Sequence, residues 1–155
     1  MSASILFVCL GNICRSPLAE AALRAEAERA GLAVEVDSAG TGDWHVGSPP
    51  DNRAQAVALR HGIDISGYRG RQVTAVDFQR FDYVFALDAE NLRNLRRVRP
   101  SDGTAELRLL MDLVPGREGS GVTDPYFGDD AGFDVTWDDV TRAARAIVER
   151  LRDRD

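Results

Sequence analysis

A cysteine and an arginine near the N-terminus are the two residues whose types and spacing could do chemistry together. The apolar run 4–8 leads directly into Cys9, and Arg15 is followed by Ser16 and Pro17. A short apolar run of this composition predicts a strand, and a proline suits the first turn of a helix. The sequence therefore predicts a strand, a tight loop and a helix N-terminus, with Cys9 where the strand ends and Arg15 where the helix starts.

A loop that enters a helix N-terminus suits a tetrahedral phosphate dianion. Backbone N–H groups and the positive end of the helix dipole point to one place, and the Arg15 guanidinium can bind two phosphate oxygens at once. The same field is expected to stabilise a Cys9 thiolate, which can attack phosphorus in line. Ser16 can donate a hydrogen bond to that sulfur, and Gly11 and Asn12 tolerate left-handed backbone. We therefore predict a phosphate-binding loop with Cys9 as the nucleophile.

The Cys-x5-Arg spacing is weak evidence on its own, because all 19 basic residues are arginine. In such a chain, the chance that at least one of the two cysteines begins a Cys-x5-Arg pattern is about one in four. The alternative is an inert buried cysteine beside an arginine that caps a helix. The strand before Cys9 and the helix start after Arg15 favour the phosphate site.

Strand and helix patterns alternate along the chain and predict the elements that must position this loop. Strands are predicted at 4–8, 34–36, 82–87 and 107–110, helices at 17–31, 52–61, 88–97 and from Trp137 to near the C-terminus, and a surface loop from Ser38 to Pro50. This alternation is typical of an α/β fold. We expect a single domain over residues 1–155, built on an open parallel sheet of about four strands with helices on both faces and the phosphate-binding loop after the first strand. Ligands of such sheets bind at the carboxyl ends of the strands, where Cys9 would lie.

Composition excludes several classes of function. The net charge of −6 argues against nucleic acid as a partner, because phosphate-backbone binding needs a basic face. No apolar run approaches the roughly 20 residues of a membrane span, and no signal-peptide pattern opens the chain, so we expect a cytoplasmic protein without a membrane partner, although export by a non-signal route stays open. With no lysine, and with only two cysteines and two histidines, the chain has no Schiff-base residue and no spaced set of metal ligands. Neither a cofactor nor a metal is expected.

The segment from Cys9 to Pro17, CLGNICRSP, resembles the signature loop of the low-molecular-weight protein tyrosine phosphatases. The segments 37–41, 44–47, 61–63 and 124–126 fall in the order and approximate spacing of that family, so the resemblance covers essentially the whole chain. The compact length and the Gly-Thr-Gly before Asp43 look more like bacterial members. Phe127 stands where vertebrate members usually have a second tyrosine, which puts regulation through a tyrosine pair in doubt.

The resemblance implies hydrolysis of protein phosphotyrosine through a cysteinyl-phosphate intermediate. Cys9 would be the nucleophile, Arg15 the phosphate clamp, and Asp124 the general acid and then the base. The substrate-binding residues would be Leu10, Gly11, Asn12, Ile13, Cys14 and Ser16 of the loop, with Trp44 and Tyr126 as walls of the cleft. The implied partner is a phosphotyrosine-containing protein, such as a tyrosine kinase, and the product is inorganic phosphate.

Other interpretations of the same residues compete with this one. An arsenate reductase of similar fold needs cysteines after Cys14, and none follows. A phosphocysteine carrier must protect its phosphate from water, whereas Arg15 and Asp124 promote hydrolysis. Phosphoarginine specificity stays open, because some bacterial relatives have threonine where Ile13 stands; the apolar side chain favours an aryl ester. Without the resemblance, Asp124 would be a plain Asp-Pro turn. A reversible Cys9–Cys14 disulfide, making the protein redox-sensitive, is a further hypothesis.

Overall fold

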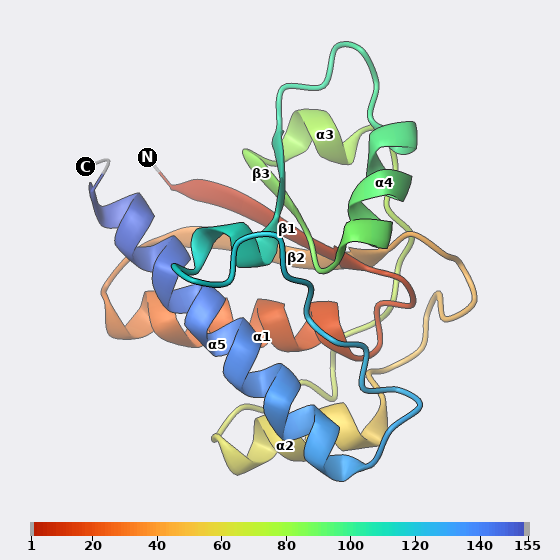
Figure 1. Cartoon of the computed structure of the whole chain (residues 1–155), viewed down its shortest axis with the longest axis vertical. Helices are drawn as coiled ribbons and strands as arrows, with labels where there is room; N and C mark the ends of the chain where they lie inside the picture. Colours follow the sequence, from red (N-terminus) through yellow and green to blue (C-terminus); the bar gives the residue numbers. More distant parts are fainter. Residues whose placement is uncertain (1, 154–155) are drawn as a thin grey trace.

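The computed structural model describes residues 2–153, which form an open sheet with helices on both faces (Figure 1). The strands are β1 (Ala3–Cys9), β2 (Val34–Gly40), β3 (Tyr83–Ala86) and β4 (Glu106–Leu109), all parallel in the order β2-β1-β3-β4. The helices are α1 (Arg15–Arg29), α2 (Asn52–Arg60), α3 (Asp77–Arg80), α4 (Ala89–Val98) and α5 (Asp130–Asp153), and a 3-10 helix, η1, covers Leu110–Leu113. The predicted α/β fold is confirmed.

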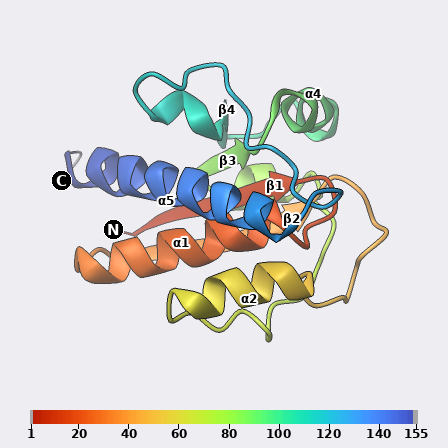
Figure 2. The ribbon, with the colours of Figure 1, turned by 60° about the horizontal axis from the view of Figure 1, so that its bottom comes forward.

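The alternation of side chains along β1 divides the core into two layers. Ile5 and Phe7 pack with α1, α2 and α5 on one face of the sheet, and Leu6 and Val8 pack with α3 and α4 on the other. All four are buried, because β1 is a central strand covered on both faces, as parallel sheets usually are. Figure 2 shows α1 and α5 side by side over one face, with α4 on the opposite side.

The order of the strands brings two loops together at one edge of the sheet. After β1 the chain continues to β2 on one side of the sheet, and after β3 it continues to β4 on the opposite side. The carboxyl ends of the neighbouring strands β1 and β3 therefore form the switch point at which open α/β sheets bind ligands. Cys9 lies at the end of β1, and Asp88 follows β3 closely as the N-cap of α4.

Two predictions of local structure were wrong, and two short helices were not predicted. Residues 38–40, predicted as loop, continue β2, because Ser38, Ala39 and Gly40 pair with the end of β1. The last helix begins at Asp130 rather than Trp137, and its added first turns bury Phe133 in the core. The short helices α3 and η1 were not predicted, since four residues are too few to show a periodic pattern. No helix within residues 2–153 has the length and apolar character to cross a bilayer.

Candidate active site

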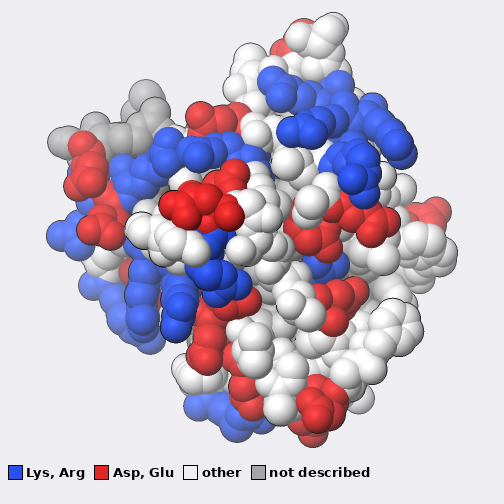
Figure 3. Space-filling view, viewed as in Figure 1, with Lys and Arg blue, Asp and Glu red and all other residues white. Residues whose placement is uncertain are grey.

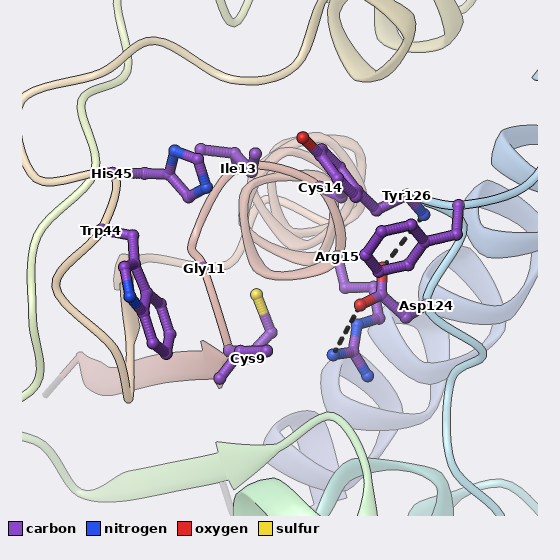
Figure 4. A pocket seen from close by; sticks show the side chains of 11 residues that line it. Cys9, Gly11, Ile13, Cys14, Arg15, Trp44, His45, Asp124 and Tyr126 are labelled. Atoms are coloured by element: carbon purple, nitrogen blue, oxygen red, sulfur yellow. Dashed lines mark hydrogen bonds and ion pairs between the residues drawn. The ribbon is translucent and has the colours of Figure 1, made fainter.

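A pocket opens where β1 and β3 end, and the predicted loop forms its floor (Figure 4). It is lined by Cys9, Leu10, Gly11, Ile13, Cys14, Arg15, Trp44, His45, Asp124, Tyr126 and Phe127. Trp44 and Tyr126 lie on opposite sides of the Cys9 sulfur, and Asp124 lies beside Arg15. Chain segments far apart in the sequence thus meet around one sulfur atom.

The loop between β1 and α1 is tight because two backbone positions allow it. Asn12 has a φ of 57°, the only non-glycine residue with positive φ among residues 2–153. At the end of β2, a Cβ atom on Gly40 would lie 2.8 Å from the carbonyl oxygen of Leu10, closer than real side chains approach. Glycine at position 40 therefore lets the neighbouring strand pack against the loop.

A buried chain of hydrogen bonds supports the Cys9 sulfur from behind. The Ser16 hydroxyl lies 3.0 Å from the sulfur, and the Asn12 side-chain amide donates to Ser16 at 2.8 Å and to Ser38 at 3.0 Å. Ser38 in turn donates to the Glu20 carboxylate at 2.7 Å. The side-chain oxygen of Asn12 also accepts a hydrogen bond from the backbone N–H of Arg71 at 3.0 Å. These contacts aim the Ser16 hydroxyl at the sulfur, where it can donate to a thiolate.

Glu20 is an unusual member of this chain, because it is a carboxyl group with almost no exposure on the inner face of α1. Burial raises its pKa above the ordinary value, although hydrogen bonds from Ser38 and Arg24 oppose that shift. Arg24 also binds the carbonyl oxygen of Val36 at 2.7 Å, which ties the pair to β2. The loop is thus connected to both α1 and β2.

Arg15 is buried and held from two sides. Its Nη1 donates to the Asp88 carboxylate at 2.6 Å and to the carbonyl oxygen of Val122 at 3.1 Å, and its Nη2 lies 3.7 Å from the Asp124 carboxylate. Burial opposes the charged form of Arg15, but Cys9 and Asp88 outweigh it and raise the pKa of the guanidinium. Arg15 is therefore a fixed cation beside the sulfur.

Asp124 belongs to an exposed segment that precedes α5. Its Oδ1 accepts the backbone N–H of Tyr126 at 3.1 Å. Arg53, from the first turn of α2, donates to the carbonyl oxygens of Tyr126 at 2.9 Å and Gly128 at 3.1 Å. Arg53 is itself held by Asp51, with two contacts of 3.1 Å, and the N–H of Asp51 donates to the carbonyl oxygen of Ile13 at 2.8 Å. A short bridge therefore connects the Asp124 segment to the loop between β1 and α1.

Aromatic side chains stand at the mouth of the pocket with much of their surface in solvent. Trp44 is 70% exposed and Phe127 is 92% exposed, while the Tyr126 and Phe127 rings pack edge to face with centroids 4.9 Å apart. Exposed apolar groups gathered around one opening are typical of a binding site. The rim can thus contact an aromatic group that enters the pocket.

The other cysteine and the two histidines differ in their relation to the pocket. Burial is the main cause that raises the pKa of the Cys14 thiol, with Asp51 and Cys9 adding to it, so Cys14 stays protonated near neutral pH. His45 lines the pocket, whereas His61 ends α2 and stacks on Trp137 at 4.9 Å, outside the pocket. Residues 2–153 contain no group of three or more side chains suited to bind a metal ion.

The pocket brings together nine of the eleven predicted site residues. Asn12 and Ser16 do not line it; they lie buried behind the loop. Sequence reasoning missed the supporting residues Asp88, Glu20, Ser38, Asp51 and Arg53, and it missed Phe127 as part of the rim. For Asp88 a signal existed, because it directly follows a predicted strand next to the first one in the sheet.

Comparisons with known proteins agree with this geometry. Residues 4–155 match the model of the family described as low molecular weight phosphotyrosine protein phosphatase. A low molecular weight phosphotyrosine protein phosphatase of Schizosaccharomyces pombe is 46% identical over 132 residues, covering 83% of this chain and 84% of that protein. The crystal structure of YfkJ from Bacillus subtilis superimposes with a TM-score of 0.91 at 37% identity, over 100% of this chain and 98% of that one. A structure described as a Drosophila arginine phosphatase gives a TM-score of 0.91 at 33% identity, over 97% and 99% of the two chains.

Proposed function

Because this chain belongs to the low-molecular-weight phosphotyrosine protein phosphatase family and is a hydrolase of that class, we propose that it cleaves protein phosphotyrosine through a phosphocysteine on Cys9. The observation that carries the proposal is the Cys9 sulfur, with the Ser16 hydroxyl behind it and Arg15 and Asp124 in the same pocket. A phosphorylated tyrosine kinase is one substrate of this kind.

In the first step, the phosphate dianion binds the backbone N–H groups of the loop and the Arg15 guanidinium. The Cys9 thiolate attacks phosphorus, so that a sulfur–phosphorus bond forms while the bond to the phenolic oxygen breaks. Asp124 gives its proton to that oxygen, and tyrosine leaves as the neutral phenol. Arg15 is already charged and fixed by Asp88, so little reorganisation is needed as charge develops on the equatorial oxygens.

In the second step, Asp124 is ionised and accepts a proton from a water molecule that attacks the phosphocysteine. The sulfur–phosphorus bond breaks, inorganic phosphate forms, and the thiolate returns to Cys9. The hydrogen bond from Ser16 stabilises this leaving thiolate. The exposed position of Asp124 at the pocket mouth supports this role, because water reaches it once the phenol has left.

The pocket walls favour an aryl ester over a guanidinium phosphate. Ile13 contributes an apolar surface, and the rings of Trp44 and Tyr126 can pack against a phenyl group. Phosphoarginine remains the second candidate, because a structural neighbour at 33% identity is described as an arginine phosphatase. Hydrolysis of two matched peptides, one with phosphotyrosine and one with phosphoarginine, separates the candidates; we expect a higher kcat/KM for phosphotyrosine.

The mechanism is tested with p-nitrophenyl phosphate at mildly acidic pH in the presence of a chelator. We expect turnover by the wild type, none by Cys9→Ser, and a loss of roughly 10²–10⁴-fold in Asp124→Ala. Vanadate should inhibit competitively. An inactive wild type whose Cys9 still accepts phosphate from a donor protein would instead identify a phosphocarrier.

A further inference from the structure

A cluster of arginines covers α4 and the neighbouring strand β4, on a chain whose net charge is negative. We call this cluster the α4 arginine patch; it consists of Arg93, Arg96, Arg97, Arg99 and Arg108. Figure 3 shows positive charge gathered over α4, with acidic side chains bordering it on the side below. The four arginines in and directly after α4 are exposed, and Arg108 is half-buried.

The patch differs from most other arginines of the molecule in having no carboxylate partner. Nine arginines elsewhere lie within 4.0 Å of a carboxylate, among them Arg24, Arg71 and Arg117. Within residues 2–153, no member of the patch has such a contact; the one side-chain hydrogen bond that a patch guanidinium donates runs from Arg97 to Asn94 at 3.5 Å. Arg96 and Arg97 lie in the last turn of α4, where the helix dipole favours a cation, but like charges held close together on a helix repel one another. Since no carboxylate neutralises the cluster, its side-chain donors are free for a partner.

The patch begins close to the phosphate pocket. Asp88, which binds Arg15 at 2.6 Å, is the N-cap of α4. A helix rises 1.5 Å per residue, so Arg93 lies about 7 Å along the helix from Asp88, and Arg99 about 16 Å. An extended peptide spans about 3.3 Å per residue. Side chains three to six positions from a phosphotyrosine in the pocket can therefore reach the patch.

Apart from Arg15 in the pocket and Arg53 beside it, most charged residues nearer the pocket have the opposite sign. Asp88 and Glu90 belong to the start of α4, and Asp43, Asp124 and Asp129 belong to the two loops that border the pocket. An acidic residue next to the phosphotyrosine would meet these carboxylates, whereas one a few positions away would meet guanidinium groups. A long uniform polyanion such as nucleic acid would cross both regions, so the pattern favours a peptide with its acidic residues in one block.

We propose that the α4 arginine patch docks an acidic segment of the protein substrate, centred three to six residues from the phosphotyrosine; this rests on the proposed function. Guanidinium groups bind Asp and Glu carboxylates through paired N–H···O bonds. The complementary charge accelerates encounter and lowers KM without touching the reacting atoms. The patch would thus select among phosphotyrosine proteins by a feature outside the pocket.

The test compares one triple variant with a matched control. Arg93→Glu/Arg96→Glu/Arg97→Glu reverses the patch, and Arg142→Glu/Arg150→Glu/Arg152→Glu changes the net charge equally on α5, at exposed arginines that also lack a carboxylate partner within residues 2–153. Substrates are phosphotyrosine peptides with four glutamates or four glutamines at positions three to six, placed on either side of the phosphotyrosine. Thermal unfolding of both variants shows whether they remain folded.

For the wild type at low salt, we expect about tenfold higher kcat/KM for one acidic peptide than for its glutamine counterpart, equivalent to about 1.4 kcal/mol. The preference should shrink at high salt, disappear in the patch variant and persist in the α5 control. Hydrolysis of p-nitrophenyl phosphate should be unchanged in both.

Equal activity of the wild type on acidic and glutamine peptides would overturn the docking proposal, and so would an equal loss of the preference in both variants. Inhibition by an oligonucleotide at concentrations where a glutamate peptide has no effect would also overturn it. Failure of all phosphotyrosine peptides with the wild type would instead contradict the proposed function.

Discussion

The loop that carries Cys9 and the segment that carries Asp124 face each other across the pocket, yet they are held in different ways. Behind Cys9, the side chains of Ser16, Asn12, Ser38 and Glu20 form a continuous buried chain of hydrogen bonds. Asp124 lies in an exposed segment, fixed to the rest of the molecule largely through backbone carbonyls that Arg53 and Arg15 bind.

This difference matches the two tasks that the proposed mechanism assigns. A thiolate and a phosphate need donors that are fixed before the substrate arrives, because reorganisation at the moment of reaction costs rate. An acid that later activates water needs contact with solvent and room for the leaving group. We therefore expect changes on the Cys9 side to affect both stability and chemistry, and changes on the Asp124 side to affect mainly proton transfer.

Asn12 gives the largest expected effect on the Cys9 side. Asn12→Ala removes three hydrogen bonds and places alanine at a φ of 57°, so we expect the free energy of unfolding to fall by about 2–4 kcal/mol. Displacement of the loop should lower kcat by about 10²-fold. Urea unfolding and p-nitrophenyl phosphate hydrolysis measure the two effects.

Asn12→Gly separates the two causes, because glycine accepts the left-handed backbone but supplies no amide. It should recover about 1 kcal/mol of stability relative to the alanine variant while kcat stays low. Wild-type activity in Asn12→Gly would show that the site needs only the backbone shape, and the hydrogen-bond chain would lose its assigned role.

Arg53 tests the opposite side of the pocket. Arg53→Gln keeps the Asp124 carboxyl group but removes the contacts to Tyr126 and Gly128 that hold its segment in position. Proton transfer from Asp124 should therefore slow down, and more so for a leaving group that depends more on protonation. We expect kcat to fall about tenfold for phenyl phosphate and less than about threefold for p-nitrophenyl phosphate, with little change in the free energy of unfolding because ion pairs near the surface contribute little to stability.

Two controls define this result. In an Asp124→Ala background, Arg53→Gln should have no further effect on phenyl phosphate, since residues that act as one unit are not additive. Arg60→Gln, at an exposed ion pair on the same helix, should leave both substrates unchanged. Equal losses for the two leaving groups would mean that Arg53 supports the pocket as a whole and not the acid.

The same contrast explains what the sequence could predict. Cys9, the loop and Arg15 are contiguous, and strand, turn and helix signals are local, so the amino-acid sequence alone is enough to predict the tight loop that places Cys9 and Arg15 in one pocket. Its supports are distant in sequence: Ser38 contacts Glu20 over 18 positions, Arg53 contacts Tyr126 over 73, and Arg15 contacts Asp88 over 73. No periodic pattern links such pairs. The family resemblance suggested a role for Asp124, and the fold explains how that residue comes to lie next to Arg15.

Glu20 gives the smallest expected effect and reports directly on the buried chain. Its pKa in the folded state is raised, chiefly by burial, so folding favours the protonated carboxyl group. Its contribution to stability is therefore fully present below the ordinary value of 4.5 and is lost as pH rises through the folded-state value. In Glu20→Gln this dependence is absent.

We expect the stability of the wild type relative to Glu20→Gln to fall as pH rises from about 4 to 8, by about 1.4 kcal/mol for each unit of pKa difference. Glu28→Gln, at an exposed position of α1, should show no such slope in urea unfolding. If wild type and Glu20→Gln give parallel curves, Glu20 is not held as a desolvated carboxyl group, and the Cys9 side of the pocket is more open to water than its contacts indicate.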